Sequence, residues 1–329
     1  MVKSMLKRLL LLVSYILFNL FFHGVSLATS LTYITFIPQW RPQAQFAGYY
    51  VAYEKGFYKK YGLNVKILTG GPDSPSNEYL KEGKAEFATM WLSSAIQMKA
   101  HGIKIINIAQ ILQRSSLMLV AWRSKVKDIQ DLNGKKIGVW GSTFIVPLKA
   151  FIKKYNLKVK IIPQMGSINL FLRGGVDAAT AMWYNEYDKI INSGVDPCEL
   201  TTFLFYKYGL NFPEDGIYVL QSTYKKYPNI CAAFVKASIE GWLYAFKHPK
   251  EAIDIVLKYM FNAHVPANRA HQTWMLQAIE KAFFYHAINS IGILKKSDYY
   301  KVANILMQEG LINNIPLFKD FYKNCYVKR

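Results

Sequence analysis

The feature that most constrains the fold is a regular alternation of short strand-like segments with helical segments over the first two-thirds of the chain. Residues 31–38 alternate polar and apolar side chains as a β-strand does, and the aromatic residues after them recur at the three- and four-residue spacing of a helix face. The other segments that we expect to be strands are residues 63–67, 85–90, 103–109, 117–122, 136–140, 159–162 and 178–183. Alternating strands and helices predict an α/β fold with parallel sheets. From residue 228 to residue 310 the pattern is helical.

The N-terminus has the layout of a secretory signal peptide. Basic residues precede an apolar run over residues 9–22, and small residues follow up to Ala28. A retained membrane anchor is the alternative, but it needs about 20 apolar residues, and this run is shorter. We therefore expect an exported, periplasmic protein whose signal is cleaved near Ala28.

Charge and cysteine content exclude several classes of function. The net charge of the 329 residues is +20, yet no basic run is longer than two residues, which indicates a solvated basic surface rather than a nucleic-acid partner. Cys198, Cys231 and Cys325 allow at most one disulfide, and none need form. No Cys-x-x-Cys pair is present, so neither a zinc site nor a redox motif is predicted.

Tryptophan residues mark the ends of four expected strands, where open α/β sheets bind their ligands. They are Trp40, Trp91, Trp140 and Trp183, each beside hydroxyl, amide or carboxylate groups. Such groups suit a flat molecule, because rings pack on its faces and polar groups bind its edge. Packing between elements is the alternative for each tryptophan. Phosphate-loop, dinucleotide, zinc-protease and serine-hydrolase motifs are missing from the sequence, and no catalytic residue is predicted.

Four sequence blocks in order resemble the thiamine-pyrimidine family: WRPQAQFAGYYVAYEKGFYKKYGLNVKI, LTGGPDS, LNGKKIGVWGS and MWYNEYDK. That family includes periplasmic binding proteins of ABC importers and the fungal enzyme that makes the thiamine pyrimidine. A more distant likeness is to the alkanesulfonate- and nitrate-binding proteins. The resemblance covers roughly residues 31–252 and implies the type II periplasmic binding protein fold, two α/β lobes that each hold a mainly parallel sheet flanked by helices. After a signal at 1–28, residues 29–120 and 219–329 would form lobe one, and residues 121–218 would form lobe two.

The strand ends and the resemblance together predict a ligand site in a cleft between the lobes. Trp40 would form one wall, and Tyr184 and Glu186 would approach from lobe two. In related pyrimidine binders an acidic residue contacts the ring amine, and the resemblance places Glu186 at that position. The full set of expected ligand-binding residues is Trp40, Gln43, Gln45, Met90, Trp91, Gly141, Ser142, Thr143, Trp183, Tyr184, Glu186, Asp215 and Tyr218.

The function implied is that of a monomeric solute-binding protein, which passes a thiamine-precursor pyrimidine or a similar aromatic heterocycle to an ABC permease in the inner membrane. No cofactor, metal or nucleic acid is expected. Riboflavin is the alternative ligand within the family, and an alkanesulfonate or nitrate is a third. The synthases hold pyridoxal phosphate on a lysine and consume a histidine of their own chain, but Met90 and Ser94 occupy those positions here. The cysteines expected near residues 212–218 are also missing, so we expect no enzyme.

Overall fold

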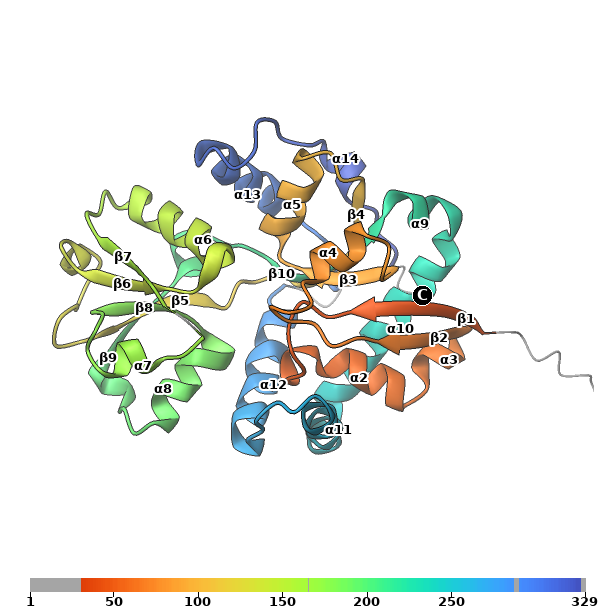
Figure 1. Cartoon of the computed structure of the whole chain (residues 1–329), viewed down its shortest axis with the longest axis horizontal. Coiled ribbons are helices and arrows are strands. Elements are labelled where there is room, and N and C mark those ends of the chain that lie inside the picture. Colours follow the sequence, from red (N-terminus) through yellow and green to blue (C-terminus); the bar gives the residue numbers. More distant parts are fainter. Residues whose placement is uncertain (1–30, 165, 287–289, 327–329) are drawn as a thin grey trace, which may run out of the picture. The chain divides into compact units, whose positions relative to one another are not determined.

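The computed structural model describes residues 31–164, 166–286 and 290–326 (Figure 1). The expected signal peptide, residues 1–28, lies outside the described residues. Within the described part, no helix combines the length and the apolar character that are needed to cross a membrane.

The first sheet has five strands in the order β2-β1-β3-β10-β4. Their bounds are β1 Thr32–Ile37, β2 Leu63–Ile67, β3 Phe87–Met90, β4 Ile105–Leu112 and β10 Glu214–Leu220. Strand β1 pairs in parallel with β2 and β3, whereas β10 runs antiparallel to β3 and β4. Strand β10 therefore brings a late part of the chain between two early strands.

The second sheet also has five strands, in the order β7-β6-β8-β5-β9. Their bounds are β5 Leu117–Trp122, β6 Lys136–Val139, β7 Lys160–Pro163, β8 Ala178–Met182 and β9 Leu200–Leu204. Strand β6 pairs in parallel with β7 and β8, whereas β5 is antiparallel to β8 and β9. Both sheets are mixed because β10 and β5, which each follow a passage from one sheet to the other, run against their neighbours.

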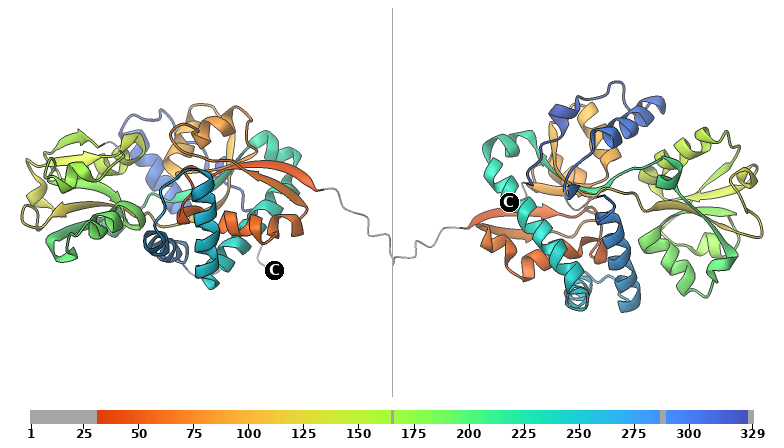
Figure 2. Two further views of the ribbon diagram at one scale, coloured as in Figure 1. Left: turned by 60° about the horizontal axis from the view of Figure 1, so that its bottom comes forward. Right: turned by 180° about the vertical axis from the view of Figure 1, so that it is seen from behind.

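Helices flank both sheets, as the α/β pattern predicts (Figure 1). Around the first sheet lie α2 Ala47–Glu54, α3 Phe57–Lys60, α4 Ser76–Lys81, α5 Leu92–Ala100, α9 Gln221–Lys226, α10 Pro228–Lys247, α11 Pro249–Asn262, α12 Arg269–Phe283, α13 Lys296–Gln308 and α14 Phe318–Phe321. Around the second lie α6 Gly141–Lys154, α7 Asn169–Leu172 and α8 Asp188–Asn192. Shorter turns are η1 Ala44–Phe46, η2 Gln130–Leu132, η3 Trp183–Tyr187, η4 Pro197–Glu199 and η5 Phe205–Tyr208. Figure 2 shows the long helix α10 crossing the back of the first sheet.

The aromatic residues after the first strand form core rather than a ligand surface. Tyr49 and Tyr50 are buried, while Tyr53 on the next turn is 41% exposed. The single helix expected over this segment is interrupted at Gly56, which adopts the left-handed backbone that glycine tolerates best (φ 73°). Helix α2 packs closely on α10, because a Cβ atom added to Gly241 would lie 2.1 Å from the carbonyl oxygen of Gly48.

Candidate functional site

Two adjacent acidic residues begin strand β10 and are fully buried. Glu214 is 0% exposed and Asp215 is 1% exposed. Asp215 has a positive φ of 52°, which is uncommon for a residue other than glycine and costs conformational energy. The burial of two carboxyl groups and the positive φ of Asp215 therefore lower the stability of the fold at the point where the chain returns from the second sheet to the first.

Glutamine side chains that follow strand β1 bind Asp215. Gln39 Nε2 donates to Asp215 Oδ1, and Gln45 Nε2 donates to Oδ2 at 2.8 Å. Gln43 Nε2 in turn donates to Gln45 Oε1 at 2.6 Å. Gln39 is fixed at its own backbone, because its amide donates to Thr89 Oγ1 at 2.9 Å. The end of β1 and strand β10 thus meet at one carboxylate.

Glu214 is bound instead by residues of the second sheet and of the segment leading into it. Its Oε1 accepts from the Ser115 hydroxyl at 2.9 Å and from the Ser116 amide at 2.6 Å. The hydroxyl of Tyr184, in η3, donates to Glu214 Oε2 at 3.4 Å. We call Gln39, Gln45, Tyr184, Glu214 and Asp215 the polar cluster. It joins residues of both sheets.

Burial changes the ionisation of the two acids. Loss of solvation raises the pKa of Glu214 to about 8, and the neighbouring charge of Asp215 adds to the effect. Burial also raises the pKa of Asp215 to about 7, against the opposing hydrogen bonds of Gln45 and Gln39. The raised pKa values favour the protonated acids, which can donate a hydrogen bond, whereas the ionised forms can only accept. Perturbed acids of this kind concentrate at functional sites.

Aromatic side chains flank this cluster along the chain. Trp40, directly after Gln39, is 39% exposed, whereas Trp91 at the end of the neighbouring strand β3 is 7% exposed. Trp91 follows β3, and its ring centroid lies 5.6 Å from that of Phe144 on α6. Met90, the last residue of β3, is buried and pairs with Gly216 of β10, one residue after Asp215. These residues lie at strand ends, as expected.

Three predicted site residues are engaged elsewhere. The Trp183 ring stacks on Tyr187 with centroids 4.6 Å apart. Glu186 Oε2 accepts from the Met182 amide at 2.8 Å, so its carboxylate is turned back onto its own chain. Tyr218 is fully buried and makes an edge contact with Phe321 at 6.1 Å. The structure therefore links Gln43, Gln45, Tyr184 and Asp215 to the polar cluster by hydrogen bonds, whereas the Trp183, Glu186 and Tyr218 side chains make the contacts described above with other residues.

The segment after β6 forms the first turn of helix α6. Gly141 is exposed with a φ of 35°, and Thr143 is half-buried. The preceding Trp140 makes no side-chain cap, although its backbone amide donates to Thr180 Oγ1 at 3.2 Å. Ser142 lies within the helix, and its side chain falls outside the described part of the structure.

Sequence reasoning missed Gln39 and Glu214. Gln39 could have been predicted as a site residue, because it lies beside Trp40 at the same strand end. Glu214 could have been suspected from the adjacent acids Glu214 and Asp215 in a chain with 41 basic and 21 acidic residues. The contacts of Glu214 with Ser115 and Tyr184 could not be predicted from the sequence, because they depend on the antiparallel placement of β10.

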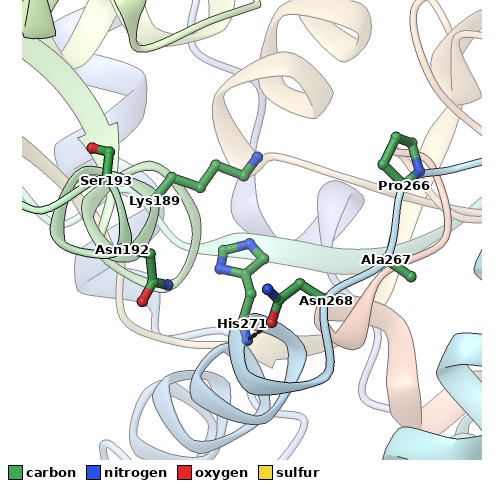
Figure 3. Close-up of a pocket in the computed structure, with 7 residues that line it drawn as sticks. All are labelled: Lys189, Asn192, Ser193, Pro266, Ala267, Asn268 and His271. Atoms are coloured by element: carbon green, nitrogen blue, oxygen red, sulfur yellow. Dashed lines mark hydrogen bonds between the residues drawn. The ribbon is translucent and has the colours of Figure 1, made fainter.

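A cavity of about 300 Å³ has no residue of the polar cluster in its lining. It is lined by Lys189, Asn192, Ser193, Pro266, Ala267, Asn268 and His271 (Figure 3). We place the candidate site at the polar cluster, because the buried acids and their donors converge there while the cavity wall is largely exposed loop and helix end. Among the described residues no group of three or more His, Cys, Asp or Glu side chains could hold a metal ion.

The architecture is that of periplasmic solute-binding proteins. The chain superposes on the periplasmic aliphatic sulphonate-binding protein SsuA of Escherichia coli with a TM-score of 0.65 at 15% sequence identity, over 87% of this chain and 95% of that chain. The chain belongs to the NMT1/THI5-like family, whose sequence model matches residues 43–252. The resemblance predicted from the sequence blocks is confirmed.

Proteins with detectable sequence similarity to this chain include both enzymes and binding proteins. The 4-amino-5-hydroxymethyl-2-methylpyrimidine phosphate synthase THI11 of Saccharomyces cerevisiae is 27% identical over 127 residues, which is 38% of this chain and 37% of the synthase. The match thus spans little more than a third of that enzyme. The riboflavin-binding protein RibY of Chloroflexus aurantiacus is 25% identical over 252 residues, 72% of this chain and 69% of RibY.

Proposed function

We propose that the chain is the exported solute-binding component of an ABC importer and that it binds a thiamine-precursor pyrimidine, or a similar aromatic heterocycle, at the polar cluster. The observation that carries this proposal is the convergence of Gln45 and Tyr184 on the adjacent buried acids Asp215 and Glu214. Glu214 and Asp215 begin strand β10 of the first sheet, Gln45 lies in η1 after β1, and Tyr184 lies in η3 directly after β8 of the second sheet. A ligand bound among them would contact elements attached to both sheets and favour the arrangement in which they meet.

The chemistry of the cluster suits a ligand with hydrogen-bond donors on its edge. An amino group on a pyrimidine can donate to an ionised Asp215, and a ring nitrogen can accept from the protonated form of either acid. The ring faces would pack against aromatic side chains, of which Trp40 is the most accessible. The separately placed Glu186 would act through η3, because its carboxylate binds the Met182 amide and so helps to hold the turn that carries Tyr184.

Simple binding can supply the affinity required. Micromolar binding corresponds to about 8 kcal/mol. Burying about 200 Å² of ring surface gives roughly 5 kcal/mol at about 25 cal/mol per Å². A few hydrogen bonds would add about 1 kcal/mol each, and the ordering of ligand and side chains offsets part of the sum. No covalent step is needed.

Alternative ligands differ in their fit to the buried acids. A sulfonate or nitrate would place a permanent negative charge against Glu214 and Asp215, which costs free energy wherever either acid is ionised. Riboflavin is the stronger alternative, because RibY is similar over 72% of this chain and the flavin ring is also flat with a polar edge. A yellow chromophore in the purified protein would favour riboflavin.

The residues of this chain fit a pyrimidine synthase activity less well than they fit ligand binding. Met90, at the position expected for the cofactor lysine, ends the buried strand β3 and cannot form a Schiff base. Ser94 lies in α5 at the position expected for the donor histidine and carries no imidazole. We therefore expect no pyridoxal phosphate absorbance after incubation with that cofactor.

The remaining parts of the proposal concern export and assembly. We propose that residues 1–28 direct export to the periplasm, and that the mature chain is a monomer that delivers its ligand to an inner-membrane permease. The proposed lobes are residues 29–120 with 219–329 and residues 121–218. The chain passes between the two sheets near residues 113–116 and 205–213, so the proposed boundaries cut through strands β5 and β10 a few residues beyond these passages.

Isothermal titration with aminopyrimidines, thiamine and riboflavin tests the proposal. We expect micromolar or tighter binding of one of them, and we expect Trp40→Ala and Glu186→Ala each to weaken it at least tenfold. Trp40→Phe keeps an aromatic face and should retain most of the affinity. The absence of binding heat from every compound would refute the ligand class, and unchanged affinity in both alanine variants would refute the position of the site.

A further inference from the structure

Helix α12 contacts the turn η3 and the start of α8 through two side chains that lie one helical turn apart. His271, 8% exposed, has Nδ1 2.6 Å from Asp188 Oδ2 and Nε2 3.1 Å from Asn185 Oδ1. Trp274 Nε1 donates to the Trp183 carbonyl oxygen at 3.1 Å. We call these five residues the latch, because they connect the two halves of the structure. Helix α12 packs with the first sheet, whereas η3 and α8 follow strand β8 of the second sheet.

The second-sheet side of the latch carries a residue of the polar cluster. Tyr184, whose hydroxyl donates to Glu214 at 3.4 Å, lies between Trp183 and Asn185 in the five-residue π-helical turn η3. Single π-helical turns are rare and often occur at functional sites. A displacement of Trp183 or Asn185 against α12 must also displace Tyr184.

The other side of the latch holds the opposite part of the cluster. Gln272, next to His271, accepts from the Ala44 amide through Oε1 at 2.7 Å. Met275, next to Trp274, accepts from the Gln45 amide through its sulfur at 3.2 Å. Helix α12 therefore fixes the turn η1 that presents Gln45 to Asp215.

The latch and the polar cluster are thus connected at both ends. On one side both use η3, and on the other side α12 of the latch holds η1, which carries Gln45 of the cluster. We propose that the latch regulates the proposed site: its hydrogen bonds hold the two sheets in the arrangement in which Tyr184 and Gln45 converge on the buried acids, and loosening it lowers the affinity for ligand. The effect on affinity rests on the proposed function, whereas the effect on η3 does not. Nothing in the latch needs to touch the ligand.

One side of the latch borders a cavity. The cavity of about 300 Å³ reaches His271 from the side of Lys189 and Asn192 on α8 (Figure 3). Asn268 caps the start of α12, with its side-chain oxygen accepting from the His271 amide at 3.0 Å. Helix α12 therefore keeps its own cap when the contacts to η3 break, and the two parts can separate without unfolding the helix.

Trp274→Phe is the informative variant, because it removes the indole donor and keeps an aromatic ring. Trp122→Phe is its matched control, because Trp122 Nε1 also donates to a backbone carbonyl, that of Phe171 at 3.3 Å. The Trp122 ring stacks on the ring of the same Phe171, which lies in α7 beside the second sheet, so neither contact reaches the first sheet. His271→Ala removes the other half of the latch and provides a second test should Trp274→Phe fold poorly.

Hydrogen exchange without ligand provides the first measurement. We expect the amides of residues 183–187 to exchange about three- to tenfold faster in Trp274→Phe, which removes one ordinary hydrogen bond, and at least as much faster in His271→Ala, which removes two. Exchange should be unchanged in Trp122→Phe. Equal exchange in the latch variants and the control would overturn the proposal.

Titration with the heterocycle that the wild-type protein binds provides the second. We expect a comparable three- to tenfold loss of affinity in the latch variants and less than a twofold change in Trp122→Phe. Faster exchange with unchanged affinity would overturn the regulation. If the wild-type protein binds none of the compounds, the proposed function fails, and the exchange measurement alone still decides whether the latch exists.

Discussion

Replacing Glu214 by glutamine should change how the stability of the protein depends on pH. The substitution keeps the shape of the side chain and removes one ionisable group that is 0% exposed. Burial and the charge of Asp215 raise the pKa of Glu214 from 4.5 to about 8. The neutral amide can still accept from the Ser115 hydroxyl and the Ser116 amide.

The sign follows from the protons bound in each state. Between pH 4.5 and about 8 the folded protein keeps the Glu214 proton while the unfolded chain has released it. The free energy of unfolding therefore falls as the pH rises through this interval, by up to about 1.4 kcal/mol per pH unit for one group. Asp215, with its pKa raised to about 7, adds a similar fall below pH 7.

Urea denaturation followed by circular dichroism at pH 5, 6, 7 and 8 measures this slope. We expect Glu214→Gln to be less stable than wild type or equal to it at pH 5, and to gain relative stability at each higher pH, by several kcal/mol in all. Histidines and other acids titrate in both proteins and cancel in the difference.

Glu82→Gln is the control, because Glu82 is exposed and the neighbouring Lys84 lowers its pKa. Since Glu82 is ionised in both states above pH 5, this variant should leave the slope unchanged. Parallel curves for wild type and Glu214→Gln would refute the reasoning, because they would mean that Glu214 is already ionised in the folded protein at pH 5.

Three further predictions follow from other parts of the structure. Gly241→Ala should destabilise the protein by about 1–3 kcal/mol in urea denaturation, because the added methyl group would lie 2.1 Å from the Gly48 carbonyl oxygen and force α10 away from α2. Arg41→Ala should change stability by less than about 0.5 kcal/mol, because its ion pair with Asp73 is 3.4 Å long and both side chains are largely exposed. Binding of an amino-heterocycle at pH 7 should release protons, because a donor lowers the raised pKa values of Asp215 and Glu214; the measured enthalpy should then differ between phosphate and Tris buffers, and equal enthalpies would contradict it.

The sequence predicted the framework of the fold because its signals are local. Alternation over residues 31–38 and 63–67 became strands β1 and β2, and the apolar run over residues 117–122 became β5. Strands β9 and β10 were not predicted as strands. Strand β10 contains Glu214, Asp215 and Gly216, which are all unfavourable in strands, so its conformation is determined by pairing with β3 and β4 rather than by propensity.

The sequence offered a location for the candidate site but not a set of contacts. The strand ends and the resemblance named Gln45, Tyr184 and Asp215 as site residues; in the structure Gln45 binds Asp215, and Tyr184 binds the adjacent Glu214. The direction of each side chain was beyond the sequence. Trp183, Tyr184 and Glu186 lie in one π-helical turn, yet their side chains have different partners. The Trp183 ring contacts Tyr187 and Trp274, the Tyr184 hydroxyl binds Glu214, and the Glu186 carboxylate binds the Met182 amide.

The chain is basic overall, whereas the candidate site holds two buried acids, so a ligand would meet different electrostatic environments at the surface and at the site. The net charge of +20 would attract anions towards the surface. Dispersed exposed charges are screened beyond about 8 Å at physiological salt, whereas a buried pair is screened much less. A ligand bound at the proposed site would therefore interact mainly with Glu214 and Asp215, which are both buried. On this proposal the basic surface would affect the rate of encounter and the two acids would affect retention, so a ligand that donates hydrogen bonds would be favoured over an anion despite the charge of the chain.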